Sequence, residues 1–161
     1  MNTKPDDRTV EQIASNIFHV LPLLRKRLLR LDVVQAEHGI PLSHAQVLTM
    51  LSETNSMSVS EISRRLGIAK PNITPLVDRL IAADLVDRVR DTGDRRVVNV
   101  VIQPAGREKL VAIQKSIGDQ VREWSETMSE EDFNELARAL DSITRILSNL
   151  QNDEIGRASC R

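Results

Sequence analysis

The chain has 161 residues, of which 40% are hydrophobic and 28% charged, and its 22 Lys and Arg nearly balance its 23 Asp and Glu. This profile fits one soluble globular domain, or one domain with an oligomerising extension, and the net charge of −1 argues against a general polyanion binder. A single cysteine, Cys160, excludes an internal disulfide, the polar start is not a signal peptide, and no apolar run approaches the roughly 18 residues of a membrane span, so we expect a cytoplasmic protein without membrane contact.

The N-terminal segment has the apolar periodicity of a helix. Apolar side chains recur in steps of three and four over residues 10–31, which predicts a long first helix. Pro22 lies inside this segment and should bend the helix or remove one of its backbone hydrogen bonds. A stop signal follows at residues 38–41, because Gly39 suits the left-handed C-cap position and Pro41 cannot continue a helix.

Three shorter helices are expected next. Two of them begin with the spacing of a capping box, in which a serine hydroxyl and a Gln or Glu side chain each bond to a free backbone amide. We therefore expect helices over residues 43–53 after the box Ser43 to Gln46, over residues 58–66 after the box Ser58 to Glu61, and over residues 70–83. Gly67 ends the second of these helices and begins the turn that leads to the third.

The periodicity then changes from helical to extended. Residues 85–90 alternate in part between apolar and charged side chains, residues 91–94 are typical of a turn, and residues 97–102 are rich in β-branched side chains. This pattern predicts a small antiparallel hairpin. Pro104 ends the second strand and suits the first turn of another long helix over residues 104–127.

The last expected helix has the most regular pattern. Ser129 is its N-cap, acidic residues occupy its first turn, and apolar residues follow at alternating steps of three and four. This stripe, the apolar seam, consists of Phe133, Leu136, Leu140, Ile143, Leu147 and Leu150. The tail, residues 151–161, loses the pattern, resembles vector-derived sequence over its last six residues, and is expected to be disordered.

Three short helices followed by a basic hairpin form the pattern of a winged helix-turn-helix, in which the last of the three helices enters the major groove of DNA. Residues 61–109 hold ten Lys and Arg against seven Asp and Glu, a net charge of +3, which leaves −4 elsewhere. A basic region inside an acidic chain is typical of a site for a phosphate backbone. Taken alone, this charge pattern is equally compatible with ordinary variation in surface charge.

The predicted fold is mainly α with a small β-hairpin wing (α+β), in which a winged helix-turn-helix domain is joined to a helical dimerisation region. The N-terminal dimerisation helix covers residues 1–42, the winged domain residues 43–103, and the C-terminal dimerisation helices residues 104–150. Their long apolar stripes exceed what a small winged domain can cover, so a second copy is expected to pack against them. The alternative is that the stripes are buried within one chain.

Four motifs follow one another in the middle of the chain. They are Ser-x-Ser-Glu-Ile-x-x-Arg-Leu-Gly-Ile from Ser58, Lys-Pro-Asn-Ile-Thr-Pro-Leu-Val-Asp-Arg-Leu from Lys70, Leu-Val-Asp-Arg from Leu85, and Asp-x-x-Asp-Arg-Arg from Asp91. This ordered set resembles the MarR family of dimeric winged-helix transcriptional regulators, with Gly106 at the family's distance beyond it. The chain departs from the family pattern at Asp84, where glycine is common.

Positions in the third helix imply contacts with DNA. Asn72 and Thr74 lie at its start and are expected to contact base edges, since an asparagine can pair bidentately with adenine. Lys70 and Arg79 are expected to contact phosphates. The alternative for Asn72 is a structural role as the N-cap of this helix, which Pro75 would favour because its missing N–H costs nothing in a first turn.

The resemblance also implies roles at the hairpin tip. Arg96 corresponds to the family's minor-groove arginine, Asp94 to its ion-pair partner, and Arg95 would then face the phosphates. Arg88 and Arg90 share the polar face of the first hairpin strand and are further candidates for phosphate contacts. The alternative is a solvated turn with a surface ion pair that contributes about 0–1 kcal/mol.

The effector-binding residues are unknown at this stage, although the family often binds a small molecule between its dimerising helices and its winged domain. A small anionic or aromatic effector is possible, and one basic cluster on the first helix could attract an anionic one; this cluster consists of Arg25, Lys26, Arg27 and Arg30. The alternative for this cluster is a solvated face or ion pairs within a dimer. Neither a metal nor a cofactor is expected, because His19, His38 and His44 lack a metal-ligand spacing.

Together these features predict a sequence-specific regulator that binds double-stranded DNA as a homodimer. We expect a repressor that binds a pseudo-palindromic operator and responds to a small-molecule effector. An enzyme is not expected, because the sequence has no phosphate loop, dinucleotide fingerprint or supported catalytic triad. The alternative function is a helical, winged protein-interaction module without DNA binding, and a salt titration of duplex binding separates the two.

Overall fold

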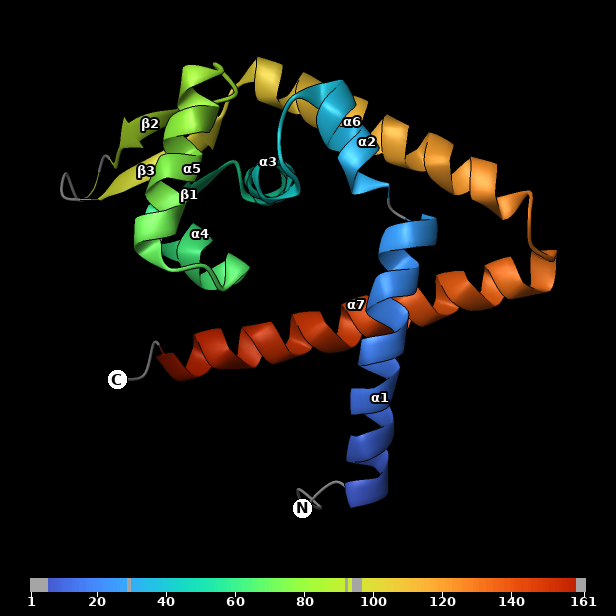
Figure 1. Ribbon diagram of the computed structural model, residues 1–161. Coiled ribbons are helices and arrows are strands. Elements are labelled where there is room, and N and C mark those ends of the chain that lie inside the picture. Colours follow the sequence, from blue (N-terminus) through green and yellow to red (C-terminus); the bar gives the residue numbers. More distant parts are fainter. Residues whose placement is uncertain (1–5, 29, 92, 94–96, 159–161) are drawn as a thin grey trace.

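The computed structural model describes residues 6–28, 30–91, 93 and 97–158, and the chain is mostly helical with one small sheet (Figure 1). The helices are α1 (Asp7–Leu23), the π-helical turn η1 (Leu24–Leu28), α2 (Leu31–His38), α3 (Leu42–Thr54), α4 (Val59–Leu66), α5 (Lys70–Ala82), α6 (Pro104–Ser125) and α7 (Glu130–Ala158). The strands are β1 (Ser56–Ser58), β2 (Val86–Arg90) and β3 (Val98–Ile102). The mainly helical fold with a hairpin wing is therefore confirmed.

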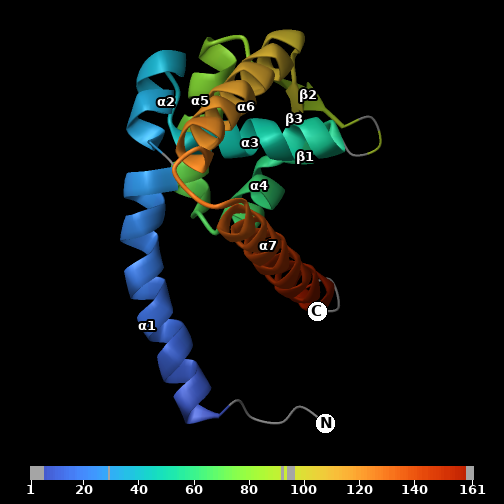
Figure 2. The ribbon, with the colours of Figure 1, turned by 90° about the vertical axis from the view of Figure 1, so that its right-hand side faces the viewer.

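The chain forms a compact part and two projecting helices. α3, α4, α5 and the sheet pack together, α6 crosses over them, and α2 lies against α6 (Figure 1). α1 and α7 extend away from this compact part (Figure 2). Most of the apolar side chains of α1, and those in the middle of α7, are exposed.

One hydrophobic core joins the short helices to the sheet. Its completely buried side chains are Val47, Leu48 and Leu51 of α3, Ile62 of α4, Ile73, Val77 and Leu80 of α5, and Val100 of β3. Burying a side chain of this kind contributes about 1.5–3 kcal/mol. The inner face of α5 is therefore held firmly, and its opposite face is free for contacts outside the chain.

The segment predicted as one helix over residues 10–31 is helical as far as Leu28, but its last five residues are π-helical and a separate helix begins at Leu31. α1 ends at Leu23, directly after Pro22, and continues as the π-helical turn η1. A proline inside a helix removes one backbone donor, and a π-type turn is one of the ways in which a helix absorbs such a change. α2 ends at Gly39, whose φ of 71° is the left-handed C-cap predicted for it.

Only one of the two predicted capping boxes exists, and only in part. α3 begins at Leu42 after Pro41, with no side-chain cap, so the box at Ser43 is wrong. The fixed φ of Pro41 already directs the chain into the helix, and Ser43 lies inside the first turn. Ser58 does cap α4, because its hydroxyl accepts the backbone N–H of Glu61 at 3.2 Å, but the Glu61 carboxylate pairs with Arg65 at 2.9 Å.

The sheet contains the predicted hairpin and one strand that the sequence did not reveal. β3 lies between β1 and β2 and pairs antiparallel with both. Val100 at the centre is opposite Met57 of β1 and Arg88 of β2. β1 has only three residues, which are too few to show a strand periodicity.

The segment around Leu85 connects α5, the sheet and α6. Asp84 has a φ of 56°, in the left-handed region that glycine adopts without cost. The aspartate that stands here in place of the family's usual glycine therefore holds a strained backbone conformation. The Leu85 carbonyl accepts the backbone N–H of Gln103 at 3.0 Å. The same oxygen lies directly against Gly106, so that a Cβ at residue 106 would overlap it. The start of α6 can approach this backbone only with a glycine.

The last helix begins as predicted and ends later than predicted. Ser129 caps α7, because its hydroxyl accepts the Asp132 N–H at 3.1 Å and donates to the Asp132 carboxylate at 2.7 Å. The helix then continues to Ala158, so the expectation of a disordered tail is wrong over residues 151–158. Once a helix is under way, each further residue adds a backbone hydrogen bond, and loss of the apolar pattern does not by itself end it. Residues 159–161 lie outside the described part of the chain.

Candidate nucleic-acid interface

The turn between α4 and α5 is closed by local hydrogen bonds. Gly67 ends α4 with a left-handed φ of 64°. The Ile68 N–H donates to the Ser63 carbonyl at 3.1 Å, and the Ser63 hydroxyl donates to the Ile68 carbonyl at 2.6 Å. These bonds fix the angle at which α5 leaves the turn, which is the geometry of a helix-turn-helix.

α5 exposes the polar residues that the sequence analysis placed on its reading surface. Lys70, Asn72 and Thr74 are all exposed, whereas Ile73, Leu76, Val77 and Leu80 are buried on the other face. The Thr74 hydroxyl donates to the Lys70 carbonyl at 3.3 Å. A side chain that returns to its own backbone in this way has to release this bond before it donates to a base edge.

The alternative role of Asn72 as an N-cap is wrong. α5 begins at Lys70 after Ala69, and the Asn72 N–H donates to the Ala69 carbonyl at 2.8 Å, as a residue inside the first turn does. Pro75 therefore lies within the helix and leaves the carbonyl four residues before it without a helical partner. The Asn72 side chain is free of the capping role and can point outward.

The first wing strand lies beside α5 and is tied to it by one ion pair. Arg88 of β2 donates through Nη2 to the Asp78 carboxylate of α5 at 2.7 Å. The two side chains are 39% and 52% exposed, so this pair contributes only about 0–1 kcal/mol to stability. Arg90 is exposed two residues further along the same strand. Arg88, expected from the sequence as a candidate for a phosphate contact, is therefore paired with Asp78 in the free chain.

The base of the wing is closed by Asp91. Its carboxylate accepts the Gly93 N–H at 2.8 Å and the Asn99 side-chain amide at 3.2 Å, and its own N–H donates to the Val97 carbonyl at 3.0 Å. The expected tip residues Asp94, Arg95 and Arg96 lie outside the described residues.

Arg79 is exposed near the other end of α5, close to a buried histidine of α3. His44 is 5% exposed, and its Nδ1 lies 3.4 Å from the Ser43 hydroxyl. Burial lowers the pKa of His44 below its usual value, and the positive charge of Arg79 lowers it further. Protonation of His44 would therefore place a positive charge in the core, close to the charge of the exposed Arg79.

We expect His44 to make folding stability depend on pH. The unfolded chain takes up a proton at His44 as the pH falls below about 6.5, whereas the folded chain resists it, so the free energy of unfolding falls in this range. Urea denaturation of the wild type and of His44→Gln at about pH 7.5 and about pH 5.5 measures the effect. The wild type should lose more stability on acidification than His44→Gln, and the exposed His19→Gln variant should behave like the wild type. Equal losses in the wild type and His44→Gln would contradict the expectation.

The other histidines have structural partners. Nδ1 of His19 lies 2.7 Å from the Ser15 carbonyl, and Nε2 of His38 lies 2.8 Å from the Ser116 hydroxyl of α6. Among the described residues, no three His, Cys, Asp or Glu side chains lie where they could hold a metal ion. No helix in the described ranges is long and apolar enough to cross a membrane.

The terminal helices present long uncovered apolar faces. The exposed apolar residues of α1 are Val10, Ile13, Ile17, Phe18, Val20, Leu21 and Leu23, and those of α7 are Leu140, Ile143, Ile146 and Leu147. Phe18 is 80% exposed, and Ile143 and Leu147 are 52% and 58% exposed. α7 touches its own chain near its start, where Phe133 lies 5.8 Å from Trp124 of α6 between ring centroids. The alternative that one chain buries its stripes by itself is therefore wrong for these residues of α1 and α7, whereas Leu110 and Ile113 of α6 are buried within the chain.

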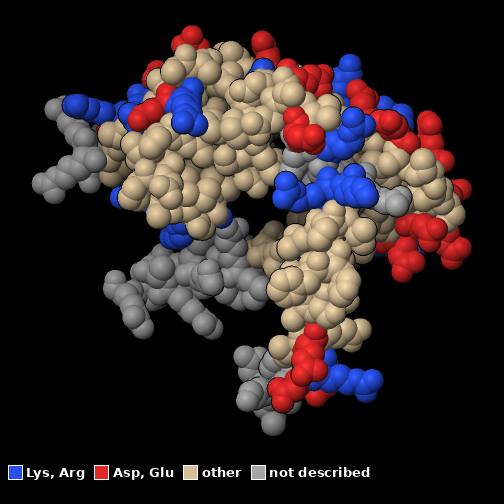
Figure 3. All heavy atoms as spheres, in the orientation of Figure 1, with Lys and Arg blue, Asp and Glu red and all other residues tan. Residues whose placement is uncertain are grey.

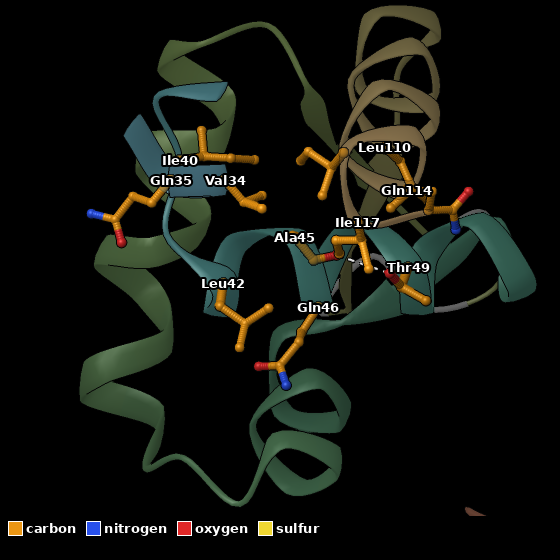
Figure 4. A pocket seen from close by; sticks show the side chains of 11 residues that line it. Val34, Gln35, Ile40, Leu42, Ala45, Gln46, Thr49, Leu110, Gln114 and Ile117 are labelled. Carbon is orange, nitrogen blue, oxygen red and sulfur yellow. Dashed lines mark hydrogen bonds between the residues drawn. The ribbon is translucent and has the colours of Figure 1, made fainter. Parts of the chain in front are cut away.

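A cavity of about 100 Å³ lies between α2, α3 and α6 (Figure 4). Its apolar lining consists of Val34, Ile40, Leu42, Ala45, Leu110, Ile113 and Ile117. The side chains of Gln35, Gln46 and Gln114 spread around its edge, and the Thr49 hydroxyl donates to the Ala45 carbonyl at 3.0 Å (Figure 4). None of these lining residues is charged.

The basic cluster of the first helix lies elsewhere. Arg25, Lys26 and Arg30 are exposed where α1 passes into η1 and α2, and Figure 3 shows basic side chains gathered there. None of these three residues lines the cavity. An anion attracted to the cluster would therefore not occupy this cavity.

Sequence reasoning missed three kinds of functional residue. Asp78, which holds Arg88, and Asp91, which closes the wing, appeared in motifs and in the charge count without a role of their own. The cavity residues come from three helices, and no local motif marks them. For Asp78 one signal was available. An acidic residue on the outer face of a helix, followed by a basic strand, indicates an ion pair between the two elements.

Comparisons with known proteins agree with this geometry. A family model described as MarR family matches residues 38–97. The uncharacterized HTH-type transcriptional regulator YcgE of Bacillus subtilis is 28% identical over 155 residues, which cover 94% of this chain and 99% of that protein. The HTH-type transcriptional repressor MdtR of the same organism is 31% identical over 84 residues, which cover 50% of this chain and 54% of that protein. A MarR family protein from Bacillus stearothermophilus has a similar structure, with a TM-score of 0.71 and 22% identity over 90% of this chain and 99% of that one.

Proposed function

The chain belongs to the MarR family of winged helix-turn-helix transcriptional regulators, and from this membership we propose that it is a repressor that binds a pseudo-palindromic DNA operator as a homodimer and responds to a small molecule. Members of this family regulate transcription and are not enzymes. The observation that carries the proposal is the exposed, polar start of α5 on a helix against which the first wing strand also packs. A relative named as a repressor supports the repressor role.

In this proposal the start of α5 reads bases in the major groove. Asn72 and Thr74 contact base edges, and Lys70 contacts a phosphate beside them. The exposure of all three side chains supports these roles. Because α5 is buried along its inner face, its position relative to the groove is set by the whole winged domain rather than by the side chains that read the bases.

The wing and the far end of α5 supply contacts to the DNA backbone. Arg79, Arg88 and Arg90 meet phosphates, which raises affinity without adding base information. The tip carries Arg96 into the minor groove, where the negative potential is strongest, with Asp94 orienting it and Arg95 on the phosphates. The closed wing base at Asp91 supports this reach, since it limits the directions in which the hairpin can extend.

The winged domain, residues 43–103, would be held in a dimer by residues 1–42 and 104–150. The uncovered apolar faces of α1 and α7 support a second copy as their partner. A two-fold dimer presents two copies of α5, so the operator should contain two half-sites with centres about 10 base pairs apart. Each subunit would then contact one half-site.

The cavity between α2, α3 and α6 is the proposed effector site. α2 is fastened to α6 at both ends, through the Arg30 N–H and the Gln120 side chain at 3.1 Å and through His38 and Ser116 at 2.8 Å. α3 belongs to the winged core and contributes another wall of the cavity. A small, largely apolar molecule that prefers one spacing between these walls would shift the separation of the two α5 helices and so change DNA affinity.

Selection of bound duplexes from a random pool, followed by a salt titration on the selected duplex, tests the proposal. We expect a pseudo-palindrome and a steep loss of affinity between low and physiological salt, because each phosphate contact releases counterions. Absence of duplex binding at any salt concentration would favour a protein-interaction module instead.

We expect Arg96→Ala to weaken operator binding by more than about tenfold, because it removes the minor-groove contact. Dimerisation and thermal melting should remain nearly unchanged. Fluorescence anisotropy with labelled operator at fixed salt measures the binding, and Lys115→Ala, which removes an exposed cation from α6, is the matched control. A binding isotherm of Arg96→Ala that overlays the wild-type isotherm would remove the wing tip from the mechanism.

A further inference from the structure

Asp78 is an acidic residue on the surface that we propose for DNA. It lies one helical turn after Thr74 on the exposed face of α5, and α5 contains no other Asp or Glu. A carboxylate at such a position repels phosphates and lowers affinity for any duplex. Its presence therefore needs a compensating role.

The geometry of β2 identifies that role. Side chains two residues apart on a strand lie on the same face, so Arg88 shares the face of Val86, which is buried in the core at 2% exposure. From this face Arg88 reaches α5, where its Nη2 lies 2.7 Å from the Asp78 carboxylate. The guanidinium has five N–H donors, and the bond to Asp78 uses one of them. The others remain available to a phosphate.

We propose that Asp78 is a specificity-determining residue that acts through Arg88. In the free protein it holds the Arg88 guanidinium at a fixed place relative to α5 and offsets its charge. Arg88 then strengthens binding only where a DNA phosphate lies within reach of the held guanidinium. A phosphate lies there when α5 is in contact with the operator bases that it reads. On other duplexes Arg88 adds little affinity for phosphates, because the Asp78 carboxylate offsets its positive charge. This inference rests on the proposed DNA-binding function.

The ion pair suits this role better than a role in folding. Both side chains are more than a third exposed, and pairs of this kind contribute about 0–1 kcal/mol to stability. Operator binding gains from a guanidinium that is already oriented, because less rotamer freedom is lost when the contact forms. Non-specific binding depends on total charge instead, so it loses most from the carboxylate.

The Asp78→Asn variant tests the proposal by comparing operator with unrelated duplex. Non-specific affinity should rise, and the slope of log K against log salt should steepen by about 0.9 for each subunit whose Arg88 gains a phosphate. Operator affinity should change little, so the ratio of the two affinities should fall by at least about fivefold. Asp119→Asn is the matched control, because Asp119 pairs with Arg122 at the same 2.7 Å on α6, away from β2. Its ratio should equal that of the wild type.

The Asp78→Asn substitution in an Arg88→Ala background shows whether Asp78 changes the affinity ratio through Arg88 or only as a nearby negative charge. If Asp78 acts through Arg88, Asp78→Asn should have no further effect on the ratio in this background. An equal fall in both backgrounds would overturn the proposal, since Asp78 would then act only as a nearby negative charge. An unchanged ratio for Asp78→Asn in a wild type that discriminates operator from other DNA would overturn it as well, and would leave the DNA-binding function intact. A wild type that binds no duplex would overturn both.

Discussion

A chain with glutamate in place of both Ile143 and Leu147 is expected to be monomeric at micromolar concentration and to bind operator at least about a hundredfold more weakly than the wild type. Both side chains lie on the apolar seam and are more than half exposed in the single chain, so a second copy has to cover them in a dimer. Two carboxylates from each subunit would then be buried in the interface without partners. The free energy needed to remove them from water exceeds what the remaining apolar contacts contribute. A monomer contacts only one half-site and loses the gain of simultaneous binding.

Sedimentation velocity and anisotropy with the operator measure the two effects together. The matched control carries Ser142→Glu and Asn149→Glu, which add the same charge to exposed positions of α7 off the apolar seam. This control should sediment as a dimer and keep its operator affinity to within a few-fold. A dimeric Ile143→Glu, Leu147→Glu protein would show that the seam is not the subunit interface.

Gly106→Ala is expected to lower the free energy of unfolding by about 3 kcal/mol, the upper part of the range for overpacking. The added methyl group would overlap the Leu85 carbonyl oxygen and press on Ile102 at 2.9 Å. Since Leu85 is buried and its carbonyl accepts the Gln103 N–H, this backbone cannot withdraw without breaking the junction of β2, β3 and α6. α6 would shift instead, and with it one wall of the proposed effector cavity.

Gly118→Ala provides the control for this substitution within the same helix. Nothing lies within 4 Å of a Cβ at residue 118, so this change should raise stability by about 0.5–1 kcal/mol through its helix propensity alone. Urea denaturation of both variants measures the difference. Equal stabilities of Gly106→Ala and Gly118→Ala would mean that the backbone at Leu85 yields more easily than its contacts indicate.

The order of elements in the winged part follows from the sequence because its signals are local. Gly67 ends α4 and Ser58 caps it, and each acts on backbone groups within a few residues. The hairpin was predicted for the same reason, since its strands have a period of two and a turn between them. The capping signal at Ser43 failed because a neighbouring residue, Pro41, already sets the start of α3.

The candidate DNA-contacting residues were chosen from the sequence, and those in the described part are exposed, but their partners were not foreseen. Arg88 was identified as a cation on a strand, whereas its contact with Asp78 depends on how β2 packs against α5. The alternative role of Asn72 was decided by the position at which α5 begins. In both cases the sequence contained the residues, and only packing decided which atoms meet.

By itself the sequence determined the helices of the winged part, the hairpin, the apolar seam of α7 and the basic region around α5, because each depends on residues a few positions apart. Only the tertiary structure decided that β1 adds a third strand and that α2, α3 and α6 enclose an uncharged cavity. These features depend on residues distant in the chain that meet in space. The requirement for glycine at residue 106 belongs with them, since it arises from a carbonyl 21 positions earlier that β2 and α6 bring together.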